Sequence, residues 1–347
     1  MLVVRFVCDK AFEVQSRGIM AQLPVPVVVS TITAGKFRRY AHMSILEHFK
    51  HPSIVFNNLI DIFKVAIGFL QSLWIIAWFQ PDVVFAKGGY VCLPMGIAAW
   101  VLRKPLIIHD SDSRPGLTNK VLARFASKIA TGFPLDNYNY AADRSVYTGV
   151  PIDSSFKPVS DKEQRRYKAD IGVDEDKPLI IAFGGGLGAV SINDAMPPLA
   201  KLLKSTTVYN ITGKANIKRA EQRGEGIANY RPVDFVYGIH KVMAAADLVI
   251  TRASATALQE LSGLAKPVIA VPARQLGDQL KNADVFVRAD AVVKVSDSHL
   301  KDDDFGKLVS KLMDDAERRQ ELSSNIRQFS RPEAAKQIAQ MIVDYRD

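Results

Sequence analysis

Two glycine-rich turns are the places in this chain where backbone groups could hold a charged ligand. The first, 86–90, follows the apolar run 81–85, and the second, 184–189, follows the apolar run 178–183. A β-branched run that ends in glycines and leads into a helix is the strand–turn–helix unit of an α/β domain. Glycine lets backbone N–H groups approach a ligand closely, and a helix N-terminus favours negative charge. The two turns therefore predict two similar domains with a diphosphate-bearing ligand between them.

The second turn must be compared with other glycine-rich phosphate loops. Its sequence fits the G-x-G-x-x-A form of a dinucleotide fingerprint, a motif that is weak by itself. A nicotinamide-binding unit needs an acidic residue at the end of the next strand, and no Asp or Glu occurs between Asp194 and Glu221. This argues against a hydride-transfer enzyme, and Gly213-Lys214 lacks the upstream glycine of a Walker loop. A tight turn that only packs a helix against its strand is the alternative.

Polar residues also follow later strands of the second half. Arg252 follows the apolar run 248–251, and Glu260 lies in the helix expected after it. A carboxylate there can bind a ribose diol, or it can be a favourable charge near the positive end of the helix. Asp278 and Gln279 open the next expected helix. We expect these groups at the carboxyl edge of the second sheet, where open α/β sheets bind ligands.

In the first half, titratable side chains follow the strand-like run 105–108. His109, Asp110 and Asp112 stand beside a glycine-bearing turn, and an imidazole with two carboxylates could transfer protons. The alternative is that Asp112 is a turn or cap residue and His109 is a core histidine. The spacing of His, Cys and Asp does not resemble a zinc site, and the sequence has no G-x-S-x-G motif. We therefore expect neither a metal site nor a serine hydrolase.

Strand-like and helix-like segments alternate along nearly the whole chain, which predicts parallel sheets with helices on both faces. The expected strands are 2–7, 26–32, 82–86, 105–109, 128–132, 145–149, 178–183, 206–211, 233–236, 247–251, 267–271 and 291–295. The expected helices are 58–79, 117–126, 190–204, 240–246, 254–263, 279–288, 304–324 and about 331–345. The turn 147–151 and the polar stretch after it indicate a domain break. We expect domains at 1–152 and 153–330, followed by a C-terminal helix in 331–347.

The composition is that of a globular protein with a basic first half. The chain has 347 residues, of which 48% are hydrophobic, so it can bury two cores and is too apolar for disorder. Two cysteines fit a reducing compartment, and the first residues do not resemble a signal peptide. The net charge is +9, and residues 1–152 hold 16 Lys and Arg against 9 acidic residues. This half could face an anionic membrane or an anionic substrate; nucleic acid is not an expected partner, because no nucleic-acid motif is visible.

The expected helix 58–79 is unusually apolar. Its polar residues are spaced three or four apart and so form one narrow stripe. They are Asp61, Lys64, Gly68, Gln71 and Ser72. Continued along the helix, the stripe meets Ile75 and Phe79, which we expect to be exposed and to contact an anionic membrane together with the basic surface. Plain burial and a membrane-spanning helix are the alternatives.

In combination, these motifs resemble those of a known family, the membrane-associated N-acetylglucosaminyltransferases of peptidoglycan synthesis that convert lipid I to lipid II. The resembling segments, in chain order, are 81–91, 115–120, 184–193, 244–249 and 260–272. The resemblance implies two Rossmann-like domains of the glycosyltransferase B type. It places UDP-N-acetylglucosamine on the C-terminal domain and the lipid-linked acceptor on the N-terminal domain, with a last helix that crosses back. It further implies a peripheral position at the cytoplasmic face of the inner membrane, inversion in a single displacement, and no obligatory cofactor or metal.

With the residues already singled out, the resemblance gives a full set of predicted site residues. The diphosphate, uracil, ribose and sugar of the donor are expected at Gly185, Gly186, Leu187, Gly188, Ala189, Phe235, Val236, Arg252, Glu260, Asp278 and Gln279. The acceptor is expected at Gly88, Gly89, Tyr90 and Asn119. The catalytic candidates are His109, Asp110 and Asp112.

The chain departs from the family pattern at several positions. Gly186 stands where a serine is usual, Asn210-Ile211 replaces His-Gln, and Asp110-Ser111-Asp112 replaces Glu-Gln-Asn. Asp153 stands where an arginine is usual, which beside a diphosphate replaces attraction with repulsion. The sequence begins at what resembles the family's second strand, so we expect an incomplete N-terminal domain and, upstream in the gene, about one β–α unit with a glycine-rich turn. A transferase with another donor or acceptor, and a non-catalytic relative that binds nucleotide sugars, are the alternatives.

Overall fold

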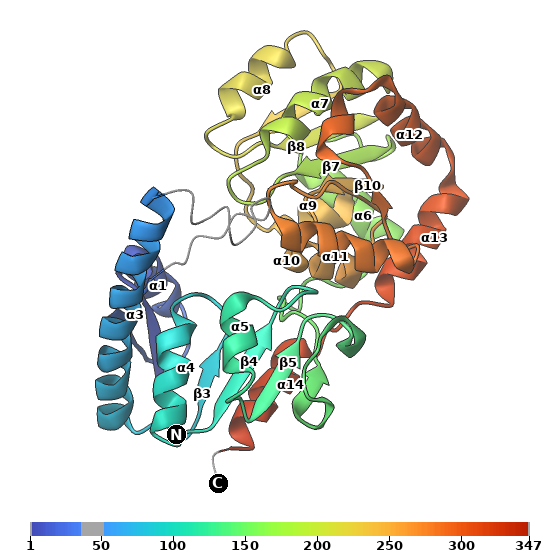
Figure 1. The fold of residues 1–347 in the computed structure, drawn as a ribbon. Helices are drawn as coiled ribbons and strands as arrows, with labels where there is room; N and C mark the ends of the chain where they lie inside the picture. Colours follow the sequence, from blue (N-terminus) through green and yellow to red (C-terminus); the bar gives the residue numbers. More distant parts are fainter. Residues whose placement is uncertain (1, 36–51, 346–347) are drawn as a thin grey trace. The chain divides into compact units, whose positions relative to one another are not determined.

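The computed structural model describes residues 2–35 and 52–345, which form two compact units (Figure 1). The first unit contains the chain up to Ser111, then Pro115–Tyr147 and the C-terminal residues from Lys336. The second unit contains Asp112–Arg114 and Thr148–Ala335. The short loop 112–114, which follows a strand of the first unit, thus belongs to the second unit by its contacts.

The first unit contains two parallel sheets. β1 (Val4–Asp9) pairs with β2 (Val27–Ile32), with Asp9 opposite Ile32 at the carboxyl end. The other sheet has the order β3-β4-β5-β6, with the strands Val84–Ala86, Leu106–Asp110, Lys128–Thr131 and Ser145–Tyr147. The helices are η1 (Lys10–Phe12), α1 (Glu13–Met20), α3 (Pro52–Phe79), α4 (Cys92–Val101), α5 (Leu117–Leu122), η2 (Leu135–Asn137), η3 (Ala142–Arg144) and α14 (Ala334–Val343). Every residue of β4 is buried, so this strand lies at the centre of the unit.

The long helix α3 turns its polar stripe toward the protein. Asp61 is 4% exposed and Ser72 is fully buried, while the Gln71 side chain accepts a hydrogen bond of 2.7 Å from the Thr33 N–H. A Cβ added to Gly68 would lie 2.0 Å from the Thr33 carbonyl oxygen. The stripe therefore packs directly against the backbone that leaves β2, and only a glycine allows this approach at position 68.

The prediction that Ile75 is exposed is wrong. Ile75 is 7% exposed and, with Ile76, packs in a core that also contains Val84 and Leu106, while Phe79 is half-buried. Helical spacing does not say which side of the helix faces the protein. Here Asp61, Gly68 and Ser72 of the stripe are buried, as is Ile75 beyond them, while Lys64 and Gln71 lie at the rim of the buried face and are exposed. The exposed apolar side chains of α3 lie elsewhere on its surface: Phe56, Leu59, Ile60, Ile62, Phe63, Ile67, Leu70, Trp74 and Trp78.

The second unit contains one parallel sheet of six strands in the order β12-β11-β10-β7-β8-β9. The strands are β7 (Leu179–Phe183), β8 (Thr207–Ile211), β9 (Tyr230–Val233), β10 (Leu248–Thr251), β11 (Val268–Ala270) and β12 (Val293–Lys294). Read from β9, this is the 3-2-1-4-5-6 order of a doubly wound dinucleotide-type fold. The order reverses between β7 and β10, so the ligand crevice of such a sheet is expected at the carboxyl ends of these two strands.

Helices cover both faces of this sheet (Figure 1). They are α6 (Asp161–Asp170), α7 (Val190–Leu202), α8 (Ile217–Arg223), α9 (Ile239–Ala245), α10 (Ala255–Leu264), α11 (Gly277–Arg288), η4 (Asp297–Lys301), α12 (Asp303–Asp314) and α13 (Ala316–Arg327). Ile192 and Met196 of α7 and Val309 of α12 share one buried cluster with Ile180 of β7 and Ile250 of β10. This cluster forms the core on one side of the sheet.

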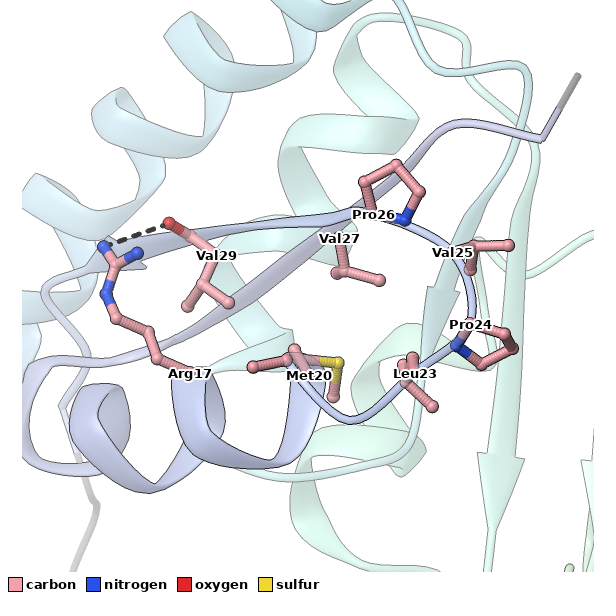
Figure 2. A pocket seen from close by; sticks show the side chains of 9 residues that line it. Arg17, Met20, Leu23, Pro24, Val25, Pro26, Val27 and Val29 are labelled. Atoms are coloured by element: carbon pink, nitrogen blue, oxygen red, sulfur yellow. Dashed lines mark hydrogen bonds between the residues drawn. The ribbon is translucent and has the colours of Figure 1, made fainter.

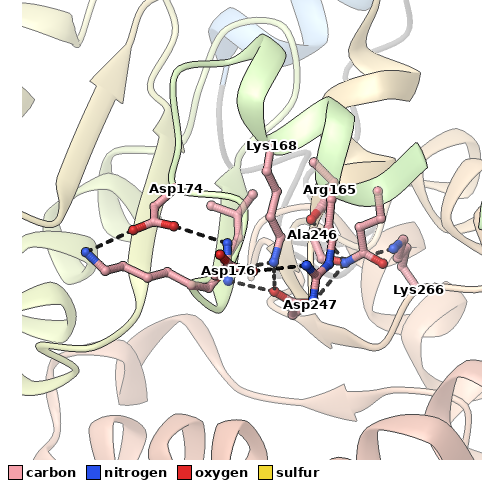
Figure 3. Close-up of polar contacts among 11 residues, drawn as sticks. Arg165, Lys168, Asp174, Asp176, Ala246, Asp247 and Lys266 are labelled. Carbon is pink, nitrogen blue, oxygen red and sulfur yellow. Dashed lines mark hydrogen bonds and ion pairs between the residues drawn. The ribbon is translucent and has the colours of Figure 1, made fainter. Parts of the chain in front are cut away.

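An ion pair between a buried lysine and a partly buried aspartate joins the amino ends of two central strands. Asp247, just before β10, accepts hydrogen bonds of 2.8 Å each from the Lys168 ammonium, the Leu179 N–H and the Gln164 side-chain amide (Figure 3). Lys266 lies beside this group and donates to the carbonyl just before Asp247. Burial lowers the pKa of Lys266 to about 8, against the opposing charge of Asp247. The cluster holds α6 and the starts of β7 and β10 together.

Several predicted elements differ from the observed ones. The strand expected at 233–236 is Tyr230–Val233, so Phe235 and Val236 follow the strand instead of lying in it. The helix expected at 304–324 is divided into α12 and α13, because the Asp315 side chain accepts from the Arg318 N–H and caps a new helix. The polar stretch after the domain break contains α6, capped by Ser160 and Glu163 in a capping box.

Candidate functional site

The glycine-rich turn at the end of β7 is half packed and half open. Gly188 has φ +77°, and a Cβ there would lie 1.8 Å from the Thr212 carbonyl oxygen. A Cβ on Gly185 or Gly186 would meet no atom within 4 Å, and Leu187 is 90% exposed. The last glycine of the turn therefore packs against the loop after β8, and the first part of the turn is open to a ligand.

Two asparagines join the glycine turn to the loop after β8. Asn193 donates a hydrogen bond of 2.9 Å to the Thr212 carbonyl, and Asn216 donates one of 3.3 Å to the Leu187 carbonyl. The sequence analysis did not identify either residue, although Asn193 lies one turn into the helix that follows the glycines. Ala189 precedes α7 and provides no side-chain cap, so the helix's first N–H groups are open to an anion.

Arg252, at the end of β10, is predicted to bind the donor, but its guanidinium already has partners within the unit. It donates to Asp297 at 2.5 Å, to the Ser191 hydroxyl at 2.8 Å and to the Val271 carbonyl at 3.0 Å. Ser191 also donates to Asp297, at 2.6 Å. Since Ser191 lies in the first turn of α7, Arg252 braces the helix that follows the glycine turn.

Glu260 lies on α10 near the same edge of the sheet. It is partly buried, and among the described residues no side chain or backbone N–H donates a hydrogen bond to its carboxyl group. Burial raises the pKa of Glu260 to about 7. A partly buried carboxyl without a protein donor is suited to accept hydrogen bonds from a ligand's hydroxyl groups.

Gln279 and Asp278 lie at the start of α11. The Gln279 side-chain carbonyl accepts a hydrogen bond of 3.0 Å from the Ala273 N–H, which fixes the amide so that its NH₂ group is the remaining donor. Asp278 is exposed. Beyond β9, the rings of Phe235 and Tyr237 meet edge to face with centroids 5.2 Å apart, and Tyr237 is 92% exposed. Tyr237 is an aromatic site candidate that the sequence analysis missed.

Asp112, one of the catalytic candidates, is held by a residue of α11. The fully buried Asn282 donates to the Asp112 carboxylate at 2.9 Å and to the Ala253 carbonyl at 3.3 Å, and its oxygen accepts from the Ser113 N–H at 2.8 Å. Burial raises the pKa of Asp112, and the hydrogen bond from Asn282 partly offsets the rise. Because Asn282 contacts both Asp112 and Ala253, which follows β10, Asp112 lies near the carboxyl end of β10. Glu260 lies on α10, the helix that follows the same strand.

The other two catalytic candidates lie in the first unit and are buried. His109 is fully buried, with the Ser111 hydroxyl 3.2 Å from its Nδ1, and Asp110 is 4% exposed and accepts a hydrogen bond of 2.7 Å from the Tyr140 hydroxyl. By their contacts, His109 and Asp110 belong to the first unit, whereas Asp112 is grouped with the second.

The first glycine turn follows β3 and packs on a buried asparagine. Gly88 has φ +92°, and a Cβ there would lie 2.6 Å from Asn119, whose amide donates to the His109 carbonyl at 3.1 Å. Asn119 is 1% exposed, so the turn packs on it from the protein interior. Gly89 is exposed and Tyr90 half-exposed, which leaves them as the part of the turn that a ligand could reach.

Comparison with known proteins supplies the family. The glycosyltransferase family 28 C-terminal domain model matches residues 179–338, and the N-terminal domain model of that family matches residues 15–131. A UDP-N-acetylglucosamine--N-acetylmuramyl-(pentapeptide) pyrophosphoryl-undecaprenol N-acetylglucosamine transferase from Geobacillus kaustophilus is 34% identical over 297 residues, which are 84% of this chain and 77% of that protein. A Bacillus cereus protein of the same name, numbered 2, is 34% identical over 263 residues, covering 74% of this chain and 69% of that protein. The chain belongs to this glycosyltransferase family.

Solved structures agree with the family in fold. MurG of Acinetobacter baumannii matches with a TM-score of 0.72 at 20% identity and covers 99% of each chain. A UDP-GlcNAc 2-epimerase from Neisseria meningitidis bound to UDP-GlcNAc matches with a TM-score of 0.64 at 13% identity, over 99% of this chain and 100% of that one. The predicted fold class, two Rossmann-like domains of the glycosyltransferase B type, is confirmed.

Asp153 and Gly186, two positions where the sequence departs from the family pattern, differ in their surroundings. Asp153 is exposed, and hydrogen bonds from the Ser155 hydroxyl and N–H lower the pKa of its carboxyl, so it is negatively charged at neutral pH. Gly186 lies in the open part of the glycine turn, where a side chain would meet nothing.

Proposed function

We propose that the chain transfers N-acetylglucosamine from UDP-N-acetylglucosamine to a polyprenyl-diphosphate-linked muramoyl peptide, with inversion at the anomeric carbon. The observation that carries this proposal is the edge of the second sheet at β7 and β10. There an open glycine turn, an uncapped helix start and the carboxyl of Glu260 stand where a doubly wound sheet binds nucleotides. The names of the relatives supply the donor and the acceptor class.

The donor roles follow from the contacts of each residue. The N–H groups of 185–189 and the start of α7 bind the diphosphate, and they stabilise the negative charge that develops as UDP leaves. Glu260 accepts hydrogen bonds from the ribose hydroxyls, and Gln279 donates its NH₂ group to the sugar. Phe235 and Val236 flank the uracil. Arg252 is a positioning residue in this scheme, since it braces α7 instead of touching the donor.

The chemistry requires one proton transfer. The acceptor hydroxyl oxygen forms a bond to the anomeric carbon while the bond from that carbon to the UDP oxygen breaks. The acceptor proton passes to a base, and we assign this role to Asp112 because its carboxylate is less buried than Asp110 and lies at the edge that holds the donor groups. UDP leaves with the bonding electron pair, and the chain needs no further reactant.

The direct test is transfer by the purified full chain. UDP-N-acetylglucosamine and a short-chain polyprenyl-diphosphate N-acetylmuramyl pentapeptide should give UDP and a disaccharide acceptor, detected by mass. UDP-glucose, which lacks the acetamido group, is the matched donor control. If the chain binds UDP-N-acetylglucosamine but transfers nothing to this acceptor, the proposal is wrong and a nucleotide-sugar-binding role replaces it, a result to which Asp153 would contribute.

We also propose that the exposed apolar face of α3 rests on the inner leaflet of the membrane at the cytoplasmic side. Within the described residues, α3 supplies the one stretch, Leu59–Phe79, that is long and apolar enough to cross a membrane, and 28% of its strongest window is buried. Asp61 and Ser72 are nevertheless buried against the rest of the unit, which favours a helix lying on the membrane over one crossing it. The stacked rings of Trp74 and Trp78, 6.3 Å apart, are suited to the interface. The excess of basic residues in 1–152 adds attraction to anionic lipid.

A further inference from the structure

A polar cavity lies in the first unit, at the carboxyl ends of β1 and β2. It has a volume of about 400 Å³, and its lining includes Asp9, Lys10, Thr31, Thr33, Lys64 and Gln71. This volume lies within the range of small-molecule sites, about 300–1,000 Å³. Lys64 and Gln71 belong to the polar stripe of α3, so the inward direction of that stripe gives the cavity one of its walls.

The wall between α3 and β2 is built by close backbone contact. A Cβ on Gly35 would lie 2.2 Å from the Asp61 carbonyl oxygen, just as one on Gly68 would collide with the Thr33 carbonyl. The Gln71 side-chain oxygen accepts a hydrogen bond from the Thr33 N–H, and the Lys64 ammonium lies 3.3 Å from the Asp61 carboxylate. The polar groups of this wall are therefore fixed in place before any ligand arrives.

The chemistry of the lining is mixed in charge and rich in hydrogen-bonding groups. Lys10 and Lys64 offer ammonium groups, and Thr31 and Thr33 offer hydroxyls that can donate or accept. Asp9 lies at the end of β1, and its carboxylate caps the next turn by accepting from the Ala11 N–H at 2.8 Å. Such a lining suits a polar ligand with amides and a carboxylate better than it suits an apolar chain.

A second cavity at the opposite end of β2 provides a contrast. It measures about 360 Å³ and is lined mainly by apolar side chains, among them Met20, Leu23 and Val27, with Arg17 at its edge (Figure 2). The same strand thus has an apolar hollow at its amino end and a polar one at its carboxyl end, where parallel sheets place ligands.

The polar cavity adjoins the acceptor side of the unit. A Cβ on Gly68, in the polar stripe of α3, would lie 3.5 Å from Pro94 of α4, the helix that follows the glycine turn. The charge of Asp9 also reaches Tyr90, since it adds to the larger effect of burial in raising the pKa of the Tyr90 phenol. Tyr90 ends the glycine turn that is expected to meet the acceptor. A ligand seated on this turn would therefore have the cavity beside it.

We propose that this cavity binds the peptide of the lipid-linked acceptor, through Lys10, the threonine hydroxyls of 31 and 33, and the Gln71 amide. The inference rests on the function proposed above, because the acceptor in that reaction carries a peptide and a diphosphate on one sugar. The glycine turn takes the sugar and diphosphate, and the neighbouring cavity takes the peptide. The polar stripe of α3 then faces inward because it contributes to a binding site.

A binding experiment tests the cavity without any turnover. Soluble N-acetylmuramyl pentapeptide is titrated into the full chain, and we expect Lys10→Ala to weaken its binding about tenfold, the effect of one lost charged hydrogen bond. Thr31→Val, which removes a hydroxyl at nearly constant shape, should weaken binding by a smaller factor. Lys104→Ala is the matched control, because Lys104 precedes the amino end of β4, in the other sheet of the unit, and is not among the residues that line the cavity. No binding by the wild type, or equal binding by the wild type and both cavity variants, would overturn the proposal.

Transfer assays then separate the cavity from the function. Lys10→Ala should raise KM about tenfold for the acceptor with its peptide, and leave KM unchanged for UDP-N-acetylglucosamine and for the same acceptor without peptide. An equal rise for both acceptors would place the sugar or diphosphate in the cavity and overturn the peptide assignment. If the wild type transfers to neither acceptor, the proposed function fails, and the titration still decides whether the cavity binds the peptide.

Discussion

The side-chain amide of Asn282 donates a hydrogen bond of 2.9 Å to the carboxylate of Asp112. Asn282 is fully buried and also accepts from the Ser113 N–H, so both ends of its amide are fixed by the loop 112–114 and the strand end beside it. The carboxylate that we assign as the base is thus contacted by a neutral side chain whose own position is fixed. Burial and the nearby charge of Asp278 raise the pKa of Asp112, while the hydrogen bond from Asn282 lowers it, so the three together set the pH at which the base becomes active.

The first prediction concerns this pair. A base works only when deprotonated, so kcat should rise with pH through the raised pKa of Asp112. Asp112→Asn should remove that acidic limb and lower kcat by about 100-fold or more, the usual contribution of a general base. Asn282→Ala should keep the limb but move it to higher pH, because the hydrogen bond that lowers the pKa is lost.

The pH profile distinguishes this role from a structural one. Loss of stability alone would lower kcat at all pH values without moving the limb. The family pattern described above has asparagine at position 112. An Asp112→Asn variant that keeps full kcat would therefore show that the base lies elsewhere. KM for UDP-N-acetylglucosamine serves as the control, and it should change little in Asp112→Asn.

The second prediction concerns Glu260. Replacing it with alanine should weaken UDP and UDP-N-acetylglucosamine binding by about 1–3 kcal/mol, the range for hydrogen bonds to a charged group. The measurement is calorimetric titration at pH 8, where the carboxyl is ionised because its pKa is about 7. Unchanged affinity together with a lower melting temperature would instead support the simpler role of a favourable charge on the helix.

Glu260 should also make stability depend on pH. Its pKa is raised from 4.5 to about 7, so the folded chain binds a proton that the unfolded chain has released across this window. The free energy of unfolding should therefore fall as pH rises from about 4.5 to about 7. Glutamine at this position would not ionise, so the Glu260→Gln variant should not lose free energy of unfolding over this pH range. The variant should be more stable than the wild type at pH 8 by about 1–3 kcal/mol, with little difference at pH 4. Denaturant melts at the two pH values provide the check.

Local sequence was sufficient to predict what depends on short patterns. Both glycine turns lie where an apolar run leads into a helix, and most of the expected strands of the second half match the observed ones. The positions of Glu260 and Gln279 at one edge of the second sheet follow from strand order, because a parallel sheet brings the ends of its strands to one edge; their role in binding the donor stays a prediction. The apolar α4 was missed, since its composition resembles a buried strand as much as a buried helix.

What the sequence could not supply depends on contacts between distant segments. The roles of Asn193, Asn216 and Asn282 arise only when loops far apart in the chain meet, and a lone asparagine in a helix gives no local signal. Arg252 shows the same limit. Its residue type suggested a phosphate ligand, but its partners Ser191 and Asp297 lie 61 residues before it and 45 residues after it in the chain. The direction of the α3 stripe likewise required the position of β2.

The third prediction contrasts two glycines of one turn. Gly188→Ala should abolish UDP binding and destabilise the second unit, because its positive φ is unfavourable for alanine and its Cβ would overlap the Thr212 carbonyl. Gly186→Ser should fold normally, since a side chain there meets nothing, and its hydroxyl should tighten UDP binding severalfold by donating to a phosphate. Thermal melts and UDP titrations of both variants provide the measurement. Looser binding by Gly186→Ser, at unchanged stability, would mean that the diphosphate does not lie at this part of the turn.

The fourth prediction concerns the two faces of α3. Replacing Trp74 and Trp78 with serine should lower binding to vesicles of anionic phospholipid at least about tenfold, because each exposed ring would otherwise bury a large apolar area in the lipid. Stability should change little, and raising the salt concentration should weaken wild-type binding, because the basic surface is screened.

Ile75→Ser is the matched control from the inward face. It should destabilise the first unit by about 2–4 kcal/mol through a cavity in the core, while the fraction that stays folded binds vesicles as the wild type does. If instead the tryptophan variant binds vesicles normally, the outward face of α3 is not the lipid contact.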